Sequence, residues 1–317
     1  MSGIRTNDEL ETDKTIIETA IIKGLEYLKS EGQDWFYPSY TTDTREIEGT
    51  VPVPRQIFSS ALIADTLPEN SSTSELKAQA LGYVGSNMSS GLLSFFEDGR
   101  YPPPDADTNS LASSVLLENG LIELQTANRV LNAVLSYRDL KGRVRVWLSD
   151  DMPDDLDALV GANALYFGYL LKREQDMVET ENWIVEVLNS YHYIPDGTHY
   201  YPSPDAFLYF LGRLLAFPKM KERLHDRLAN HLRQRIGTTE YSLDLAMRTI
   251  LASSLGIPNE KEYQKILETQ NADGSWPSDA LFSEGRKAVL YGLYYGNKSL
   301  PTAFSIRALE NRSKTPD

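Results

Sequence analysis

The sequence contains no cysteine and only four histidines among its 317 residues. The lack of cysteine excludes disulfide bonds, thiolate zinc sites and cysteine nucleophiles. The histidines show no metal-ligand spacing with carboxylates, so we expect neither a metal nor another cofactor. Basic residues are also scarce: 31 Lys and Arg stand against 45 Asp and Glu, which gives a formal net charge of −14. Because no basic cluster could neutralise phosphates, this charge argues against a nucleic-acid partner.

Long hydrophobic runs are missing as well. No apolar segment reaches the ~18 residues that span a bilayer, and the polar, acidic start of the chain, residues 1–15, is unlike a signal peptide. The hydrophobic content of 41% is nevertheless ample for a core. We therefore expect a soluble, cytoplasmic protein. A lipophilic substrate leaves peripheral contact with a membrane open, and the oligomeric state is open too.

Strand signals are almost absent, and helical periodicity fills the chain. Amphipathic, charged segments, such as 14–30, 74–88, 219–236 and 260–270, alternate with more apolar segments rich in small residues, such as 154–172. Further helices are expected at 284–295 and 302–310, with a short hairpin at 141–147. About six such helix pairs of roughly 45–50 residues fit the length, a period typical of helical repeats.

This alternation predicts an all-α protein with an (α/α)6 barrel of about twelve helices. The apolar helices would form an inner ring and the amphipathic helices an outer ring. No linker divides the chain. We expect a single domain over residues 1–317, with loose tails at 1–13 and 311–317.

The segment 101–114 has the pattern of a helix start. Three consecutive prolines stop any incoming helix, Asp105 and Asp107 are natural capping residues, and an apolar helix continues from Leu111. Asp105, Asp107 and Asn109 would then surround one helix N-terminus. Taken alone, the pattern fits a capped helix after a proline turn as well as an acid site.

A second motif, Gln270-x-x-x-Gly274-x-Trp276, follows a predicted helix. A glycine just past a helix end can cap it in the left-handed conformation. The tryptophan can then stack on a neighbouring helix while the glutamine amide binds backbone groups. We assign Trp276 a structural role.

Together these two motifs resemble those of the class II terpene cyclases of the squalene–hopene cyclase superfamily. Residues 270–276 resemble the QW repeat of that family, and Asp105-Ala-Asp107-Thr108 resembles its Asp-x-Asp-Asp or Asp-x-Asp-Thr acid motif. The resemblance implies cyclisation of an isoprenoid by proton transfer, without a metal. It points to single-domain members that cyclise a prenylated aromatic acid, such as geranylgeranyl dihydroxybenzoate. A cyclase of geranylgeranyl diphosphate and a non-catalytic isoprenoid-binding protein are the alternatives.

The chain departs from the family pattern at one position. Members that extend the motif to a further aspartate would place it at 109, where this chain has Asn109. An amide cannot supply the acid proton. Either Asp107 is the donor, or an aspartate at 109 has been replaced. We favour the replacement, since an acid at 109 would be flanked by Asp107 and Ser110.

Such chemistry needs a strong acid and a dry aromatic cavity. Protonating an alkene requires more acidity than a free carboxyl of pKa ~3.9 provides, and a helix N-terminus stabilises the conjugate base. Each aromatic face offers a carbocation roughly 0.5–2 kcal/mol. The candidate substrate-binding aromatics are Phe58, Trp147, Tyr166, Phe167, Tyr200, Tyr201, Tyr241 and Phe282.

Polar residues near the expected inner helices complete the hypothesis. Asn163 lies within an apolar helix, where it would orient the acid or a water, or only bind a neighbouring carbonyl. Scattered basic residues are sufficient for one carboxylate head group: Arg55, Arg248, Arg286 and Lys287.

Two other enzyme classes share this barrel. A protein prenyltransferase needs a zinc site that includes cysteine, which this chain lacks. A carbohydrate-active enzyme would need two carboxylates across a groove, for which Asp105 and Asp244 are candidates.

Overall fold

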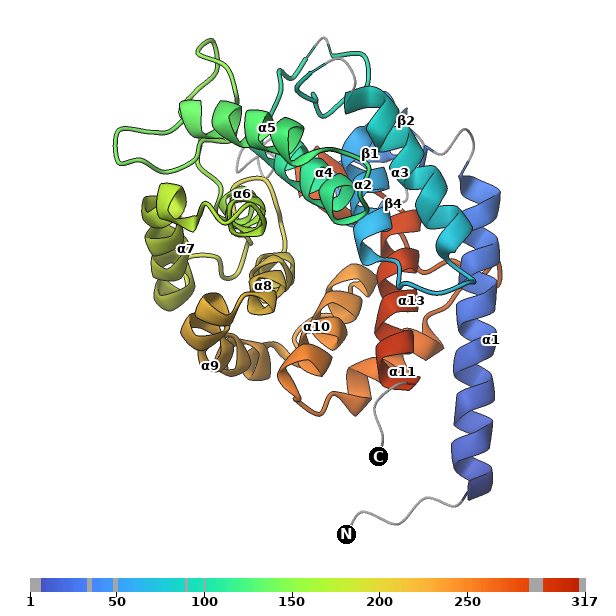
Figure 1. The fold of residues 1–317 in the computed structure, drawn as a ribbon. Helices are drawn as coiled ribbons and strands as arrows, with labels where there is room; N and C mark the ends of the chain where they lie inside the picture. Colours follow the sequence, from blue (N-terminus) through green and yellow to red (C-terminus); the bar gives the residue numbers. More distant parts are fainter. Residues whose placement is uncertain are drawn as a thin grey trace.

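In the computed structural model, which describes residues 7–32, 36–47, 51–88, 91–99, 101–284 and 293–313, helices form two concentric rings (Figure 1). Each inner helix packs against the next inner helix along the chain, and the last packs back onto the first. The inner helices are α2 (Ile57–Thr66), α4 (Ala106–Glu118), α6 (Ala158–Leu170), α8 (Pro204–Arg213), α10 (Ser242–Leu255) and α13 (Ser299–Ser313). This closed ring confirms the toroid expected from the sequence.

The outer helices cover this ring and bury only one face each. In α5, for example, the buried side chains Ala127, Val130, Leu131 and Val134 recur every three or four residues, whereas α4 buries nearly every residue. This difference is why the alternation of apolar and amphipathic segments predicts two rings. The outer helices are α1 (Asn7–Glu31), α3 (Ser74–Met88), α5 (Leu124–Ser136), α7 (Val178–Ser190), α9 (Pro218–Arg235) and α11 (Glu260–Glu268). Two short 3-10 helices, η1 (Glu174–Met177) and η2 (Leu214–Ala216), lie in the connections.

A small antiparallel sheet joins two long loops from opposite ends of the chain. Its strands β1 (Tyr40–Thr42), β2 (Val51–Pro52), β3 (Asp279–Ser283) and β4 (Tyr294–Asn297) run in the order β2-β1-β4-β3. The expectation of a helix at 284–295 is therefore wrong at its end, where β4 pairs with β1; residues 285–292 lie outside the described residues. Pairing partners about 250 residues apart override a local helical pattern here.

Other boundaries also differ from expectation. The segment 141–147 forms no hairpin of its own; Val144 pairs with Arg138, and Trp147 pairs with Asp105. Helix α1 begins at Asn7 and α13 continues to Ser313, so both helices extend into the expected tails. Polar residues such as glutamate are good helix formers, which explains why polarity alone misplaced the start of α1.

The Gln270–Trp276 element lies at the seam where the first and last parts of the chain meet. The Gln270 amide donates to the carbonyl oxygens of Ala20 (2.8 Å) and Gly274 (2.9 Å). Trp276 is fully buried, and its indole N–H donates to the Ile266 carbonyl (2.7 Å). The element thus joins α1 to the end of α11, which is the structural role expected for it.

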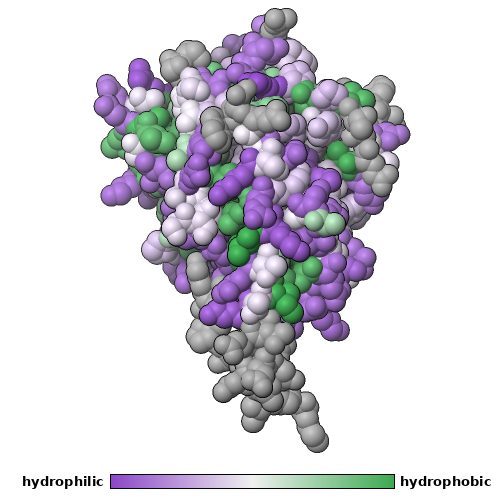
Figure 2. Space-filling view, turned by 90° about the vertical axis from the view of Figure 1, so that its right-hand side faces the viewer, coloured by the Kyte–Doolittle hydropathy of each residue, from purple (hydrophilic) through white to green (hydrophobic). Residues whose placement is uncertain are grey.

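Within the described ranges, no helix has the length and apolar character needed to cross a membrane. Figure 2 looks onto the face that carries α1. Hydrophilic side chains dominate it, and its hydrophobic residues form small separate groups.

Candidate active site

Helix α4 begins at the proline–aspartate segment, which is tied to a neighbouring loop. The Asp105 side chain caps the helix by accepting from the Thr108 N–H (2.6 Å). The backbone on both sides of Asp105 is hydrogen-bonded to the 146–148 loop. The Ala106 N–H donates to the Val146 carbonyl, and the Leu148 N–H donates to the Pro104 carbonyl (2.8 Å each). The first turn of α4, which carries Asp107, is therefore held firmly.

Asp107 is only 6% exposed, and both of its oxygens bind side chains from other elements. Oδ1 accepts from the Asn163 amide of α6 (2.7 Å), and Oδ2 accepts from the Tyr201 hydroxyl, which comes from the loop before α8. That loop is fixed by Asp157, the capping residue of α6, which accepts from the Tyr200 N–H (2.7 Å). Segments distant in sequence thus converge on one carboxyl group.

The surroundings of Asp107 favour its protonated form. Burial, reinforced by the charge of Asp105, raises the pKa of Asp107 to about 8, although hydrogen bonds from Tyr201 and Asn163 act in the opposite direction. Burial raises the pKa of Asp105 to about 6, against a hydrogen bond from Thr108. Near neutral pH, one proton is therefore held largely on Asp107 beside an ionised Asp105, and the two titrate as a pair.

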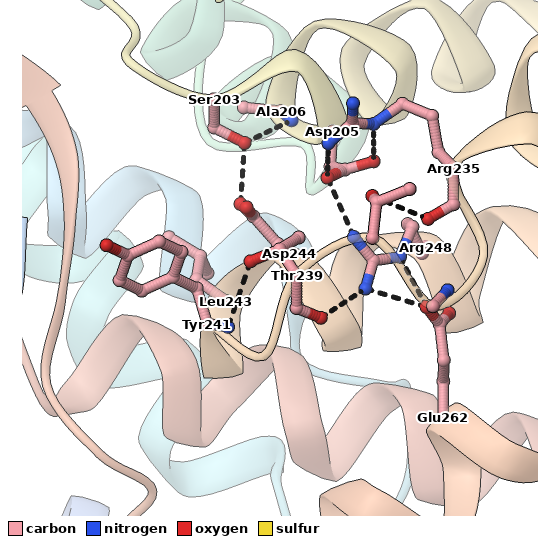
Figure 3. A network of polar contacts seen from close by, with 12 residues as sticks. Ser203, Asp205, Ala206, Arg235, Thr239, Tyr241, Leu243, Asp244, Arg248 and Glu262 are labelled. Carbon is pink, nitrogen blue, oxygen red and sulfur yellow. Dashed lines mark hydrogen bonds and ion pairs between the residues drawn. The ribbon is translucent and has the colours of Figure 1, made fainter. Parts of the chain in front are cut away.

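Asp205 occupies the same position on α8, two residues after the capping residue, but has a different environment (Figure 3). It accepts two hydrogen bonds from Arg235 (2.7 and 2.8 Å) and one from Arg248 (2.8 Å). Two guanidinium groups stabilise its charge. Burial also raises the pKa of Asp205, although its two guanidinium partners lower it. Among the described residues, the hydrogen-bond donors to the Asp107 carboxyl are neutral, so Asp107 is better suited than Asp205 to give up a proton to a substrate.

Asn109 is fully buried and bound to backbone alone. Its Nδ2 donates to the carbonyls of Leu93 and Asp105 (2.7 Å each), and its Oδ1 accepts from the Leu93 N–H (2.9 Å). The amide thereby fastens the 91–99 loop to α4. A carboxylate at this position would face two carbonyl oxygens without a proton to share.

An aromatic cluster lies next to the Asp107–Tyr201 contact. Phe282 packs edge-on against Tyr201, Phe58 and Phe95, with ring centroids 5.2–5.5 Å apart, and Phe210 lies 6.3 Å from Tyr201. Phe58, Tyr201 and Phe282 were predicted to line the site. Phe95 and Phe210 were not, because nothing local distinguishes them from core residues.

The remaining predicted aromatics lie elsewhere. Trp147 and Tyr200 pack edge-to-face (5.8 Å) in the loops beside the start of α4. Phe167 is fully buried in the core, and Tyr241 lies under the Arg45 guanidinium (4.1 Å). Tyr166 lies nearer the C-terminal end of α6, where its hydroxyl donates to Glu118 (2.7 Å).

A cavity of about 220 Å³ opens at the C-terminal ends of the inner helices. Its lining includes Tyr166, Tyr209, Arg213, Ile250, Leu251 and Arg307. Arg213 is paired with Asp65 (3.1 Å) and stacks over Tyr166 (4.4 Å). Neither Arg213 nor Arg307 is among the basic residues expected from the sequence, although a charged residue at the end of an apolar helix is a usable signal for Arg213.

Of the basic residues proposed from the sequence, Arg248 and Arg55 do not line this cavity. Arg248 is fully buried among Asp205, Glu262 and the Thr239 carbonyl (Figure 3). Arg55 lies near Glu97 (4.0 Å), and Arg286 and Lys287 lie outside the described residues.

Asp244, the second acid proposed for a carbohydrate-active enzyme, is already bound by other side chains. Asp244 accepts from Arg45 and from Ser203 (2.5 Å each) and is 1% exposed. In the part of the chain that the structure describes, no group of three or more His, Cys, Asp or Glu residues could hold a metal ion.

Known proteins resemble this chain in sequence and in fold. No protein-family model matches the chain. Over 210 residues, 65% of its length, it is 30% identical to the drimenol cyclase drtB of Aspergillus calidoustus. The chain spans only 38% of that relative.

Solved structures show the same fold. A variant of the type II terpene cyclase MstE from Scytonema, in complex with geranylgeranyl dihydroxybenzoate, aligns over 95% of this chain and 98% of its own with a TM-score of 0.70 and 12% identity. A second variant, bound to merosterolic acid A, aligns over 96% and 99% with a TM-score of 0.72 and 12% identity. A glycosidase aligns less well, with a TM-score of 0.53 and 8% identity over 99% and 100%. The resemblance to class II terpene cyclases inferred from the sequence is thus confirmed, and the chain has the toroidal fold of the type II terpene cyclase MstE.

Proposed function

We propose that this protein is a class II terpene cyclase in which Asp107 protonates the terminal alkene of a polyprenyl chain. The observation that carries the proposal is a buried carboxyl that is bound by two neutral donors and lies beside an aromatic cluster. Burial, reinforced by the charge of Asp105, raises the pKa of this carboxyl to about 8, which favours its protonated form. Asn109 has a structural role. Of the two possible donors, Asp107 and a replaced acid at 109, we therefore favour Asp107.

The reaction follows from this arrangement. The alkene π electrons take the proton from the Asp107 carboxyl, which leaves a carboxylate and a tertiary carbocation. Each further alkene then attacks the cation and closes a ring, until loss of a proton ends the sequence. Burial favours the protonated form of Asp107 before the reaction. Asn163, Tyr201 and the N-terminus of α4 then stabilise the carboxylate that remains. The faces of Phe58 and Phe282 would stabilise the cation.

We infer that the substrate is a prenylated aromatic acid. Arg307 lines the cavity, and among the described residues no ion pair engages it. A carboxylate held there, beside Arg213, would let its prenyl tail run towards Asp107 along the inner helices. An MstE variant was solved with geranylgeranyl dihydroxybenzoate bound, which supports a prenylated aromatic acid as the substrate class. Geranylgeranyl diphosphate, the alternative substrate inferred from the sequence, is the second candidate.

The test is a product assay with geranylgeranyl dihydroxybenzoate and geranylgeranyl diphosphate. We expect cyclisation of the first, no effect of EDTA, and a loss of about 10²–10⁴-fold in Asp107→Asn, the range for a general acid. Asp151→Asn, an exposed acid, is the matched control and should retain activity. If the protein prefers geranylgeranyl diphosphate, the proposed substrate is wrong. If Asp107→Asn is as active as the wild type, the proposed mechanism is wrong.

A further inference from the structure

Arg213 is held rigidly at the end of α8. Its guanidinium donates to Asp65 Oδ1 (3.1 Å) and to Asn163 Oδ1 (2.7 Å), and it lies over the ring of Tyr166 at 4.4 Å. The side chain is 9% exposed. Because Asn163 also contacts Asp107, Arg213 is one residue removed from the proposed acid.

The chemistry of the guanidinium decides the orientation of the Asn163 amide. A guanidinium carries only donors, whereas an amide has a donor end and an acceptor end. The amide must therefore turn its oxygen to Arg213, which leaves its NH2 group facing Asp107. This orientation follows from the partners alone and not from the similar shapes of the two amide ends.

The orientation of the amide in turn places the proton on Asp107. An NH2 group cannot accept a hydrogen bond, so Asp107 Oδ1 acts as an acceptor whether or not the acid is protonated. The acidic proton then belongs on Oδ2, the oxygen beside Tyr201, whose ring packs against Phe282. With the amide reversed, its oxygen would accept the proton of Asp107 and stabilise the acid against transfer.

We propose that Arg213 is a positioning residue for the acid: through Asn163 it directs the transferable proton to Oδ2 and secures a donor for the carboxylate left after transfer. The inference rests on the proposed function. It differs from a head-group role, because its effect appears in the proton-transfer step.

The test compares Arg213→Gln, Asn163→Leu and the double variant. A glutamine can donate or accept, so Asn163 becomes free to reverse. We expect kcat to fall about 10- to 100-fold in each single variant, as for loss of a hydrogen bond to a charged group. The alkaline limb of kcat against pH should move upward by about one to two units. The double variant should lose no more kcat than Asn163→Leu alone.

Two further variants separate positioning from charge. Arg213→Lys keeps a cation that can only donate hydrogen bonds, so this variant should retain most of the wild-type kcat. Arg173 offers the matched control, because it makes the same two kinds of contact away from the site. It donates to Asn132 Oδ1 of α5 (2.7 Å) and to the Asp176 carboxylate of η1. Arg173→Gln should leave kcat and the pH profile unchanged.

A readout without turnover keeps the inference independent of the assay. The pKa of Asp107, measured by 13C NMR of its carboxyl carbon and assigned with Asp107→Asn, should rise in Arg213→Gln, and much less when Asn163 is already leucine. Equal rises in both backgrounds would overturn the inference, because Arg213 would then act through space. If no substrate is cyclised by the wild type but the pKa values behave as expected, the proposed function fails and the positioning contact stands. Should Arg213→Gln not fold, Asn163→Asp retains the Arg213 contact and should raise the same pKa.

Discussion

Asp107 and Asn109 have side chains of nearly the same shape and lie two residues apart in the first turn of α4, yet their neighbours suit them to different roles. Asp107 meets an amide NH2 group and a hydroxyl, groups that tolerate either charge state of a carboxyl. Asn109 meets two carbonyl oxygens and one N–H, a set that only an amide satisfies in full. The backbone groups around position 109 are therefore better satisfied by asparagine than by aspartate.

Replacing Asn109 by Asp tests this reasoning. We expect Asn109→Asp to lower the free energy of unfolding by about 1–3 kcal/mol, because a buried carbonyl loses its donor, and to leave activity no higher than in the wild type. Urea denaturation and the product assay measure both effects. Asn119→Asp, at the exposed end of α4 with one carbonyl contact, is the control and should cost only a few tenths of a kcal/mol. A large gain in activity would instead support a replaced acid at 109.

At the scale of elements, the barrel closes where the loop after α11 meets α1. Gly274 has a φ of +88°, and a Cβ there would lie 2.3 Å from the Lys23 carbonyl oxygen. Gly24 of α1 lies against Trp276, which a Cβ at that glycine would approach to 3.0 Å. The seam therefore depends on close backbone approach as much as on the buried tryptophan.

Gly274→Ala should accordingly destabilise the protein by about 2 kcal/mol or more, through strain at a positive φ and the clash with α1. Thermal unfolding measures this. Gly82→Ala is the matched control: it lies in α3 with no atom within 4 Å of the new Cβ, and alanine should stabilise that helix by about 0.5–1 kcal/mol. Equal effects of both substitutions would contradict the role of the seam.

For the whole molecule, the raised pKa of Asp107 links stability to pH. Because the folded state binds this proton more tightly than the unfolded chain does, the stabilisation is complete below pH ~4. It is lost as the pH rises through the folded pKa of about 8.

Asp107→Asn should therefore gain stability relative to the wild type between pH ~4 and 8, and gain no more above that range. Chemical denaturation at several pH values measures the difference, with Asp151→Asn as the exposed control that should show no such trend. A constant difference across the range would mean that Asp107 ionises normally in the folded protein.

The sequence by itself determined the ring architecture and the start of α4. Inner helices are buried on all sides and outer helices on one, so their different periodicities are visible without coordinates. Three prolines followed by capping aspartates mark a helix start by local chemistry. The Gln270–Trp276 element was likewise recognisable, because its glutamine, glycine and tryptophan stand at a fixed local spacing.

Only the tertiary structure decided which polar groups meet. Arg213, Asn163 and Asp107 lie on three different inner helices, and sequence spacing carries no information on their contact. The same holds for β4, whose pairing with β1 overrides a helical pattern, and for the backbone partners of Asn109. The charge state of a buried carboxyl depends on the groups that surround it, and in a closed ring those groups come from distant parts of the chain.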